Sequence, residues 1–153
     1  MYKIYLGADH QGVELKKVIR EFLETEGYEV EDCGNSVQDP MDDYPDFIHP
    51  VAQAVAADPE NRRGVIFGRS GQGEAITANR HKGVRAALYA GGDEIIVRLS
   101  REHNDANVLS LGAGFVSPED AKRLTKLWLE TPSPVPPEGA RHLRRIGKID
   151  SGM

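Results

Sequence analysis

The stretch at residues 64–80, GVIFGRSGQGEAITANR, combines an apolar run, a glycine-rich turn and the start of a helix. The run at 64–68 has the length of a buried strand, and a helix is expected over about 73–80. A strand that passes through such a turn into a helix is typical of a parallel α/β sheet. Glycine-rich turns of this kind usually cradle an anion on free backbone amides. The stretch therefore predicts an α/β fold with an anion site in the turn.

The alternation of strand and helix continues in both directions from this stretch. Further strands are expected at 3–7, 28–32, 83–89 and 107–112, and further helices up to Gly27, at 47–57, at 93–101 and from Ser117 to about 130. Ser117 is an N-cap candidate followed by a proline, whereas Pro50 is plausible only in the first turn of its helix. Five strands alternating with helices predict a three-layer α/β/α Rossmann-like sandwich around a five-stranded parallel sheet.

The end of the chain differs in composition from the rest. Residues 131–139, TPSPVPPEG, are too rich in proline for a helix or strand and indicate a stiff, extended connector. The connector leads to a basic helix, ARHLRRIGKI, which is expected to project from the body. We expect one domain over residues 1–153, with residues 131–153 contacting a partner subunit.

Composition narrows the possible classes of protein. The 153-residue chain has 39% hydrophobic and 28% charged residues, which is ordinary for a globular domain. Its net charge of −5 argues against a general nucleic-acid binder. Apolar runs are strand-sized, so no membrane span is expected, and the N-terminus lacks a secretory pattern. Cys33 is the single cysteine, which excludes an intrachain disulfide and favours a cytoplasmic location.

Reactive side chains follow two of the predicted strands. Asp9 and His10 follow the first strand, and Ser70 and Glu74 follow the third. Ligands of open α/β sheets bind beyond the carboxyl ends of the strands, so these four side chains are expected to share one crevice. Taken singly, Asp9 and His10 would be explained by a turn and a helix cap, and Glu74 by an acid favoured at a helix N-terminus. Their placement at the same edge favours a catalytic interpretation.

A second polar cluster, REHNDANVL at 101–109, lies before the fifth strand. A helix end and turn would explain His103 and Asn104 without catalysis. Because the cluster precedes a strand, it lies at the opposite edge of the sheet from Glu74. If His103 belongs to the same site, it must come from a second subunit, which predicts a homodimer with active sites at the interface.

The last helix carries a third cluster. Arg141 and Arg145 are four residues apart and so share one helix face, with His142 and Arg144 nearby. A solvated basic face and a bidentate phosphate clamp both fit this pattern. The five histidines show no metal-ligand spacing, and the glycine turn matches neither the Walker A nor the dinucleotide fingerprint. No metal or nucleotide cofactor is therefore expected.

Six blocks of the chain occur in the same order in one known family: GADHQG, DYPDF, GRSGQGEAITANR, GVRAAL, REHNDANVL and RHLRRI. On these blocks the chain resembles the type B ribose-5-phosphate isomerases, which include the galactose-6-phosphate isomerase subunits. The resemblance covers nearly the whole chain. It implies a dimer, or a tetramer of dimers, that interconverts aldose and ketose phosphates without a metal or organic cofactor.

The resemblance also implies roles for particular residues. Many members have a cysteine base where this chain has Gly68, whereas another branch uses a glutamate at the position of Glu74. The remaining implied roles are ring opening by Asp9 and His103, stabilisation of an enediolate by Ser70 and the turn with Gly71 and Gly73, phosphate binding by His10, Arg141 and Arg145, and contacts to sugar hydroxyls by Tyr44 and Asn104. Enclosure would raise the pKa of Glu74 and the helix N-terminus would lower it.

Two positions depart from the family pattern. Arg69 replaces a small residue in the glycine turn, and Gly114 stands where many relatives have arginine. These changes leave ribose, allose, galactose and four-carbon sugar phosphates open as substrates. A non-catalytic phosphosugar or nucleotide sensor and an obligate partner in a two-chain isomerase are alternative functions.

Overall fold

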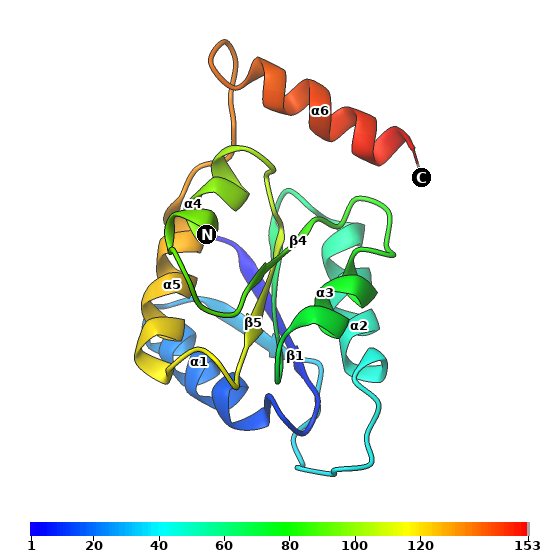
Figure 1. Cartoon of the computed structure of the whole chain (residues 1–153), viewed down its shortest axis with the longest axis vertical. Coiled ribbons are helices and arrows are strands. Elements are labelled where there is room, and N and C mark those ends of the chain that lie inside the picture. Colours follow the sequence, from blue (N-terminus) through cyan, green and yellow to red (C-terminus); the bar gives the residue numbers. More distant parts are fainter. Residues whose placement is uncertain (153) are drawn as a thin grey trace.

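A computed structural model of the chain describes residues 1–152 (Figure 1). Strands and helices alternate from the N-terminus to α5, and a last helix follows a nine-residue connection. The elements are β1 (Lys3–Ala8), α1 (Val13–Thr25), β2 (Glu29–Asp32), α2 (Pro45–Ala57), β3 (Arg62–Gly68), α3 (Gln72–Ala78), β4 (Ala86–Tyr89), α4 (Ile95–Glu102), β5 (Val108–Gly112), α5 (Pro118–Glu130) and α6 (Ala140–Ser151).

The five strands form one parallel sheet in the order β2-β1-β3-β5-β4. The chain moves outward from β1 to β2 in one direction and then returns to place β3 on the other side of β1. The order therefore reverses between β1 and β3, and the loops after these two strands diverge there. Such a switch point is the usual ligand site of an open α/β sheet.

Helices cover both faces of the sheet, so the predicted three-layer sandwich is confirmed. Helices α1, α4 and α5 cover one face, and α2 and α3 cover the other (Figure 1). Alternate residues of each strand supply the two cores, because successive side chains in a strand point to opposite faces. On β3, for example, Val65 and Phe67 face the first core and Ile66 faces the second.

Helix α5 agrees with its sequence pattern, whereas β4 is shorter than expected. Ser117 caps α5, since its hydroxyl accepts the backbone N–H of Asp120 (3.2 Å). Strand β4 begins at Ala86 and not at residue 83. At residues 83–85 the Asn107 side chain takes the place of strand pairing. It accepts from the backbone N–H of Arg85 (2.8 Å) and donates to the carbonyl of Gly83 (2.8 Å).

The expectation for Pro50 is wrong, because α2 begins earlier than predicted. Pro45 occupies the first turn of α2, which places Pro50 at the sixth residue of the helix. Proline at that position removes one helical hydrogen bond. Pro50 lies on the exposed side of α2, where water can satisfy the carbonyl group that lacks its partner.

Helix α6 stands apart from the sandwich and lies across the amino-terminal edge of the sheet (Figure 1). The imidazole of His142 stacks on His103 at the end of α4, with ring centroids 4.2 Å apart. Near the other end of α6, Asp150 pairs with Arg85 (3.3 Å), which lies just before β4. The projecting helix is thus confirmed, although the connector ends in a turn at residues 136–139 and is not extended throughout. Among residues 1–152, no helix is long and apolar enough to cross a membrane.

Candidate active site

The loops that follow β1 and β3 form the candidate site at the switch point. Ala8 pairs in register with Phe67, so the two strands end side by side. Asp9 and His10 directly follow β1, and residues 68–73, the glycine turn, directly follow β3. The structure therefore brings together the side chains that sequence analysis placed at this edge.

Glu74 lies in the first turn of α3 and is buried, with only 4% of its surface exposed. Its carboxyl group occupies the space in front of Gly68, where a Cβ atom would overlap the carboxyl oxygens. Any larger residue at position 68 would therefore displace Glu74. The glycine that stands where many relatives have cysteine is, in this chain, the space that the glutamate needs.

Burial is the largest influence on the pKa of the Glu74 carboxyl. Removal from water raises the pKa of the Glu74 carboxyl, a hydrogen bond from its own backbone N–H opposes this rise, and the nearby Asp9 carboxylate adds to it. The sequence left this balance open, and the structure shows that burial prevails. A carboxyl whose pKa is raised toward neutral pH is better suited to take up and return a proton.

The glycine turn is held in place by β5. Gly71 has φ 76°, a left-handed conformation that side chains rarely adopt, and a Cβ there would lie 2.9 Å from Ser110 Oγ. Ser110 Oγ donates to the Gly71 carbonyl (2.7 Å) and is fully buried. Ser70, the next residue back, is half-buried, and its hydroxyl accepts weakly from the backbone N–H of Gln72 (3.4 Å).

Tyr44 reaches the glycine turn from the start of α2. A Cβ atom at Gly73 would lie 2.7 Å from Tyr44 Cζ and 2.9 Å from its hydroxyl, so the ring packs directly on this glycine. The tyrosine remains 37% exposed. The structure thus places Tyr44 against the glycine turn, next to the residue that precedes Glu74.

Asp42, a residue that sequence analysis did not select, lies close to both Asp9 and His10. Asp9 is buried, and burial raises the pKa of its carboxyl. His10 Nδ1 lies 2.6 Å from Asp42 Oδ1. One ligand atom from each of the three residues lies within 4.8 Å of the others. His10 and Asp42 bond to each other and Asp9 accepts the backbone N–H of Gln11 (3.0 Å), so we interpret the trio as polar side chains that already have hydrogen-bond partners and not as a metal centre.

His103, Asn104, Arg141 and Arg145 lie at the opposite edge of the sheet from Glu74. His103 is the C-cap of α4, and Asn104 is exposed in the turn before β5. Both arginines are exposed on α6. Within one chain, the structure does not bring these four residues to the switch point.

The two departures from the family pattern form one packing arrangement. A Cβ atom at Gly114 would lie 3.2 Å from Arg69 Cγ and 3.1 Å from the Arg69 carbonyl oxygen. The side chain of Arg69 therefore uses the space that an arginine at position 114 would need. Arg69 itself is exposed beside the glycine turn.

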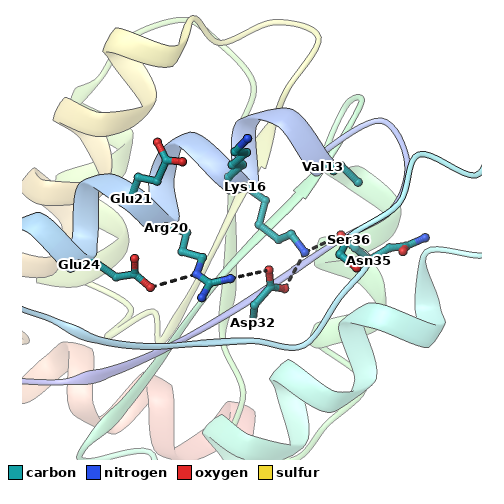
Figure 2. Close-up of a pocket in the computed structure, with 9 residues that line it drawn as sticks. Val13, Lys16, Arg20, Glu21, Glu24, Asp32, Asn35 and Ser36 are labelled. Atoms are coloured by element: carbon teal, nitrogen blue, oxygen red, sulfur yellow. Dashed lines mark hydrogen bonds and ion pairs between the residues drawn. The ribbon is translucent and has the colours of Figure 1, made fainter.

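A separate pocket of about 440 Å³ lies between α1 and the loop after β2 (Figure 2). One of its lining residues, Lys16, is only 2% exposed. Its ammonium group donates to Asp32 Oδ1 and to the Asn35 carbonyl, each at 2.6 Å. Arg20 also pairs with acidic neighbours, Glu24 at 3.0 Å and Asp32 at 3.8 Å. Four of the charged lining residues thus pair with one another, namely Lys16, Arg20, Glu24 and Asp32, and Lys16 joins α1 to the loop.

A parallel sheet whose switch point carries a buried carboxyl with a raised pKa beside a glycine turn defines a small α/β protein suited to proton transfer. Residues 4–149 match the family model described as Ribose/Galactose Isomerase. The probable ribose-5-phosphate isomerase B of Mycoplasma pneumoniae is 39% identical over 97% of this chain and 93% of its own length. Ribose-5-phosphate isomerase B of Mycobacterium leprae is also 39% identical, over 94% of this chain and 85% of its own.

Solved structures agree with these relatives. The crystal structure of Mycoplasma genitalium ribose-5-phosphate isomerase B with bound ribulose 5-phosphate has a TM-score of 0.91 at 37% identity, covering 99% of this chain and 95% of that chain. The chain belongs to the ribose/galactose isomerase family, and it is an aldose–ketose isomerase.

Proposed function

We propose that this protein interconverts D-ribose 5-phosphate and D-ribulose 5-phosphate, with Glu74 as the base. The observation that carries the proposal is the buried Glu74 carboxyl in front of Gly68, with its pKa raised and Asp9 nearby. The choice of sugar is supported by relatives that bear the name ribose-5-phosphate isomerase B and by the relative that binds ribulose 5-phosphate.

The reaction begins with opening of the sugar ring. Asp9 and His103 of the partner subunit transfer protons between the anomeric hydroxyl and the ring oxygen. Burial raises the pKa of Asp9, which helps this carboxyl to carry a proton near neutral pH. The product of this step is the open aldehyde.

Glu74 then moves hydrogen between the two reacting carbons. Its carboxylate removes the proton from C2, and the electron pair left behind forms the C1–C2 double bond of a cis-enediolate. Glu74 returns the proton to C1 while a proton passes from the C2 hydroxyl to the C1 oxygen, which leaves the ketone at C2. A well-placed base contributes roughly 100- to 10,000-fold to the rate.

The enediolate carries negative charge, and the glycine turn is next to it. To the charged oxygen of the enediolate we assign the Ser70 hydroxyl and the backbone N–H groups of residues 70, 71 and 73 as donors. Within residues 70–74, the N–H of Gln72 already bonds to Ser70 Oγ and that of Glu74 to its own carboxyl. Pre-aligned donors of this kind contribute roughly 3–4 kcal/mol each to the transition state. His10, Arg141 and Arg145 hold the phosphate, and Tyr44 and Asn104 contact the sugar hydroxyls.

The proposal requires two chains per active site, because its residues lie at opposite edges of the sheet. A two-fold axis across the strands would place the amino-terminal edge of one chain beside the carboxyl edge of the other. The surface of α3 and β4 suits such contact, since β4 is an edge strand and Ile76 and Leu88 are exposed there (59% and 38%). We therefore propose a homodimer, alone or within a tetramer.

The substrate is tested by a coupled isomerase assay on the purified chain. The panel contains the 5-phosphates of ribose and ribulose, the 6-phosphates of allose and galactose, and a four-carbon aldose phosphate. Highest kcat/KM for the ribose pair supports the proposal, and a higher value for another sugar reassigns the substrate. Binding without turnover of any sugar indicates a sensor, and activity only after a second protein is added indicates a two-chain isomerase.

The role of Glu74 is tested with Glu74→Gln, which keeps the size of the side chain but cannot take up a proton. We expect loss of turnover and loss of solvent exchange at the substrate C2 hydrogen. Glu60→Gln, a change at an exposed glutamate before β3, is the matched control and should behave as wild type. Retained C2 exchange in Glu74→Gln would remove Glu74 from the mechanism.

A further inference from the structure

His10 is held by a short contact to one buried carboxylate. Its Nδ1 lies 2.6 Å from Asp42 Oδ1, and the Asp42 side chain is only 5% exposed, whereas the His10 ring is 23% exposed. The contact joins residues 32 positions apart in the chain. Because Nδ1 is engaged, Nε2 is the ring nitrogen that remains for a ligand.

Asp42 is itself fixed from the opposite side. Its second oxygen, Oδ2, accepts from Asn35 Nδ2 (3.0 Å). The backbone N–H of Asn35 donates to the carbonyl of Ala8 at the end of β1 (2.7 Å). The Asn35 carbonyl accepts from Lys16 Nζ (2.6 Å), which Figure 2 shows reaching from α1 toward Asp32 and Asn35.

This series of contacts runs from a buried lysine in α1, through the loop after β2, to a histidine at the switch point. Every member is bonded on both sides except His10, whose free nitrogen ends the series. Asp42 holds the His10 ring at a fixed angle near Asp9. Hydrogen-bond partners orient functional histidines in the same way in other enzymes.

We propose that Asp42 is a positioning residue, which holds the His10 ring so that Nε2 binds the substrate phosphate. The inference rests on the proposed function in one respect, namely that the substrate is a phosphate. Asp42 acts through His10 and makes no contact with the reacting carbons. Asn35 and Lys16 keep the Asp42 carboxylate at the angle that His10 needs.

The charges around His10 agree with this role. The hydrogen bond that His10 donates to Asp42 is the main cause that raises the pKa of His10, burial opposes it, and the carboxylates of Asp9 and Asp39 also favour the protonated ring. Although burial disfavours ionisation of Asp42, the hydrogen bonds from His10 and Asn35 hold the pKa of its carboxyl below the usual range. The protonated ring that these carboxylates favour offers the phosphate a charged donor.

The kinetic test uses Asp42→Asn, which keeps the shape of the side chain and removes its charge. We expect KM for the sugar phosphate to rise by about tenfold at pH 7.5, the loss typical of one charged hydrogen bond, with kcat changed less than about twofold. The difference in KM should shrink below pH 6, where His10 is protonated in both proteins. Asp43→Asn removes an exposed carboxylate from the same loop that is not among the charges acting on His10, and it is the control.

A second measurement does not depend on turnover. Nuclear magnetic resonance of ring-labelled histidine follows His10 as pH is varied, with and without inorganic phosphate. Asp42→Asn should lower the midpoint of the His10 titration and weaken the shift that phosphate causes. An unchanged midpoint, or a fall in kcat with KM unaltered, overturns the positioning role. Inactivity of the wild-type chain on every sugar overturns the proposed function alone, because the titration still tests the contact of Asp42 with His10.

Discussion

At the scale of single residues, the carboxyl group of Glu74 and any side chain at position 68 compete for one volume. Gly68 leaves that volume empty, and Glu74 enters it from the first turn of α3. A cysteine side chain at position 68 would therefore collide with the Glu74 carboxyl. The two side chains are alternatives for steric reasons, and Gly68 leaves room for the glutamate that we propose as the base.

Gly68→Ala should abolish most activity and leave the protein folded. The added methyl group overlaps the end of a flexible side chain, so the Glu74 carboxyl should move away while the strand stays in place. We expect a loss of about 100-fold or more in kcat, the contribution of a general base. Steady-state kinetics and circular dichroism measure the two outcomes.

A double-mutant cycle with Glu74→Ala isolates the contact. Alanine at position 74 removes the group that the methyl would strike, so Gly68→Ala should no longer lower the free energy of unfolding in that background. Equal destabilisation in both backgrounds would show that the methyl strikes something other than Glu74.

Glu74→Gln should also stabilise the protein at alkaline pH. Because burial raises the pKa of Glu74, the native state holds this proton more tightly than the unfolded state, and stability falls as pH rises and the group ionises. Glutamine avoids this loss. Thermal unfolding should therefore show a higher Tm for Glu74→Gln at pH 8, by about 2–4 °C for each kcal/mol regained.

The pH dependence of this difference is the check on its cause. In acid both side chains are neutral, so the gain in Tm should shrink toward pH 4. A difference that is constant with pH would point to altered packing, and a lower Tm at pH 8 would contradict the raised pKa.

At the scale of elements, α6 is the helix least attached to the rest. The stack of His142 on His103 and the ion pair of Asp150 with Arg85 are the side-chain contacts that join its two ends to the body. Arg85 also pairs with Asp105 (3.1 Å), so the same turn that carries His103 anchors α6. The position of α6 therefore depends in part on His142, whose pKa is lowered where it docks.

Acid should loosen α6. Burial lowers the pKa of His142, and the neighbouring His103, Arg141 and Arg145 lower it further. An undocked helix frees His142 to return to an ordinary pKa of about 6.5, so protonation below that pH favours undocking. Hydrogen exchange should show that protection factors of residues 140–151 fall between pH 7.5 and 5.5.

His142→Phe is the control for this prediction, because phenylalanine keeps a ring that can stack on His103 but cannot take up a proton. Its protection factors should stay nearly constant over the same range. An equal fall in both proteins would place the titrating group elsewhere.

At the scale of the whole molecule, the functional residues are divided between the two edges of the sheet. Asp9 and Glu74 follow strands, whereas His103 precedes one, and parallel strands run in a single direction. The strands are about five residues long, so the two edges of the sheet lie too far apart for one chain to bring Glu74 and His103 together. A shared site between two chains satisfies both placements.

Mixed dimers test this sharing. Glu74→Gln and His103→Ala should each be nearly inactive alone. After subunit exchange at equal amounts, half of the dimers are hybrids with one intact site of two, so about a quarter of wild-type activity should return. Native mass spectrometry confirms exchange, and an inactive mixture that contains hybrids would contradict the shared site.

The fold is predictable from sequence because each helix or strand that buries one side repeats its apolar residues at a regular spacing. Strand-sized apolar runs, glycine turns and the Ser117 cap reflect contacts within a few residues. Strand direction then follows from the alternation of strand and helix, which places Asp9 and Glu74 at one edge of the sheet and His103 at the other. Pro50 and the start of β4 were misplaced, since one depends on exposure and the other on the distant side chain of Asn107.

The chemistry of the site depended on contacts through space. The sequence alone determined which strand ends carry acids, but the meeting of Asp42 with His10 joins residues 32 positions apart, and no local pattern records it. The room that Gly68 leaves for Glu74, and the burial that raises the pKa of that carboxyl, likewise exist only once α3 packs on the sheet. Periodicity encodes which side of an element is buried, whereas protonation depends on how much water and which charges the packed neighbours leave around each group.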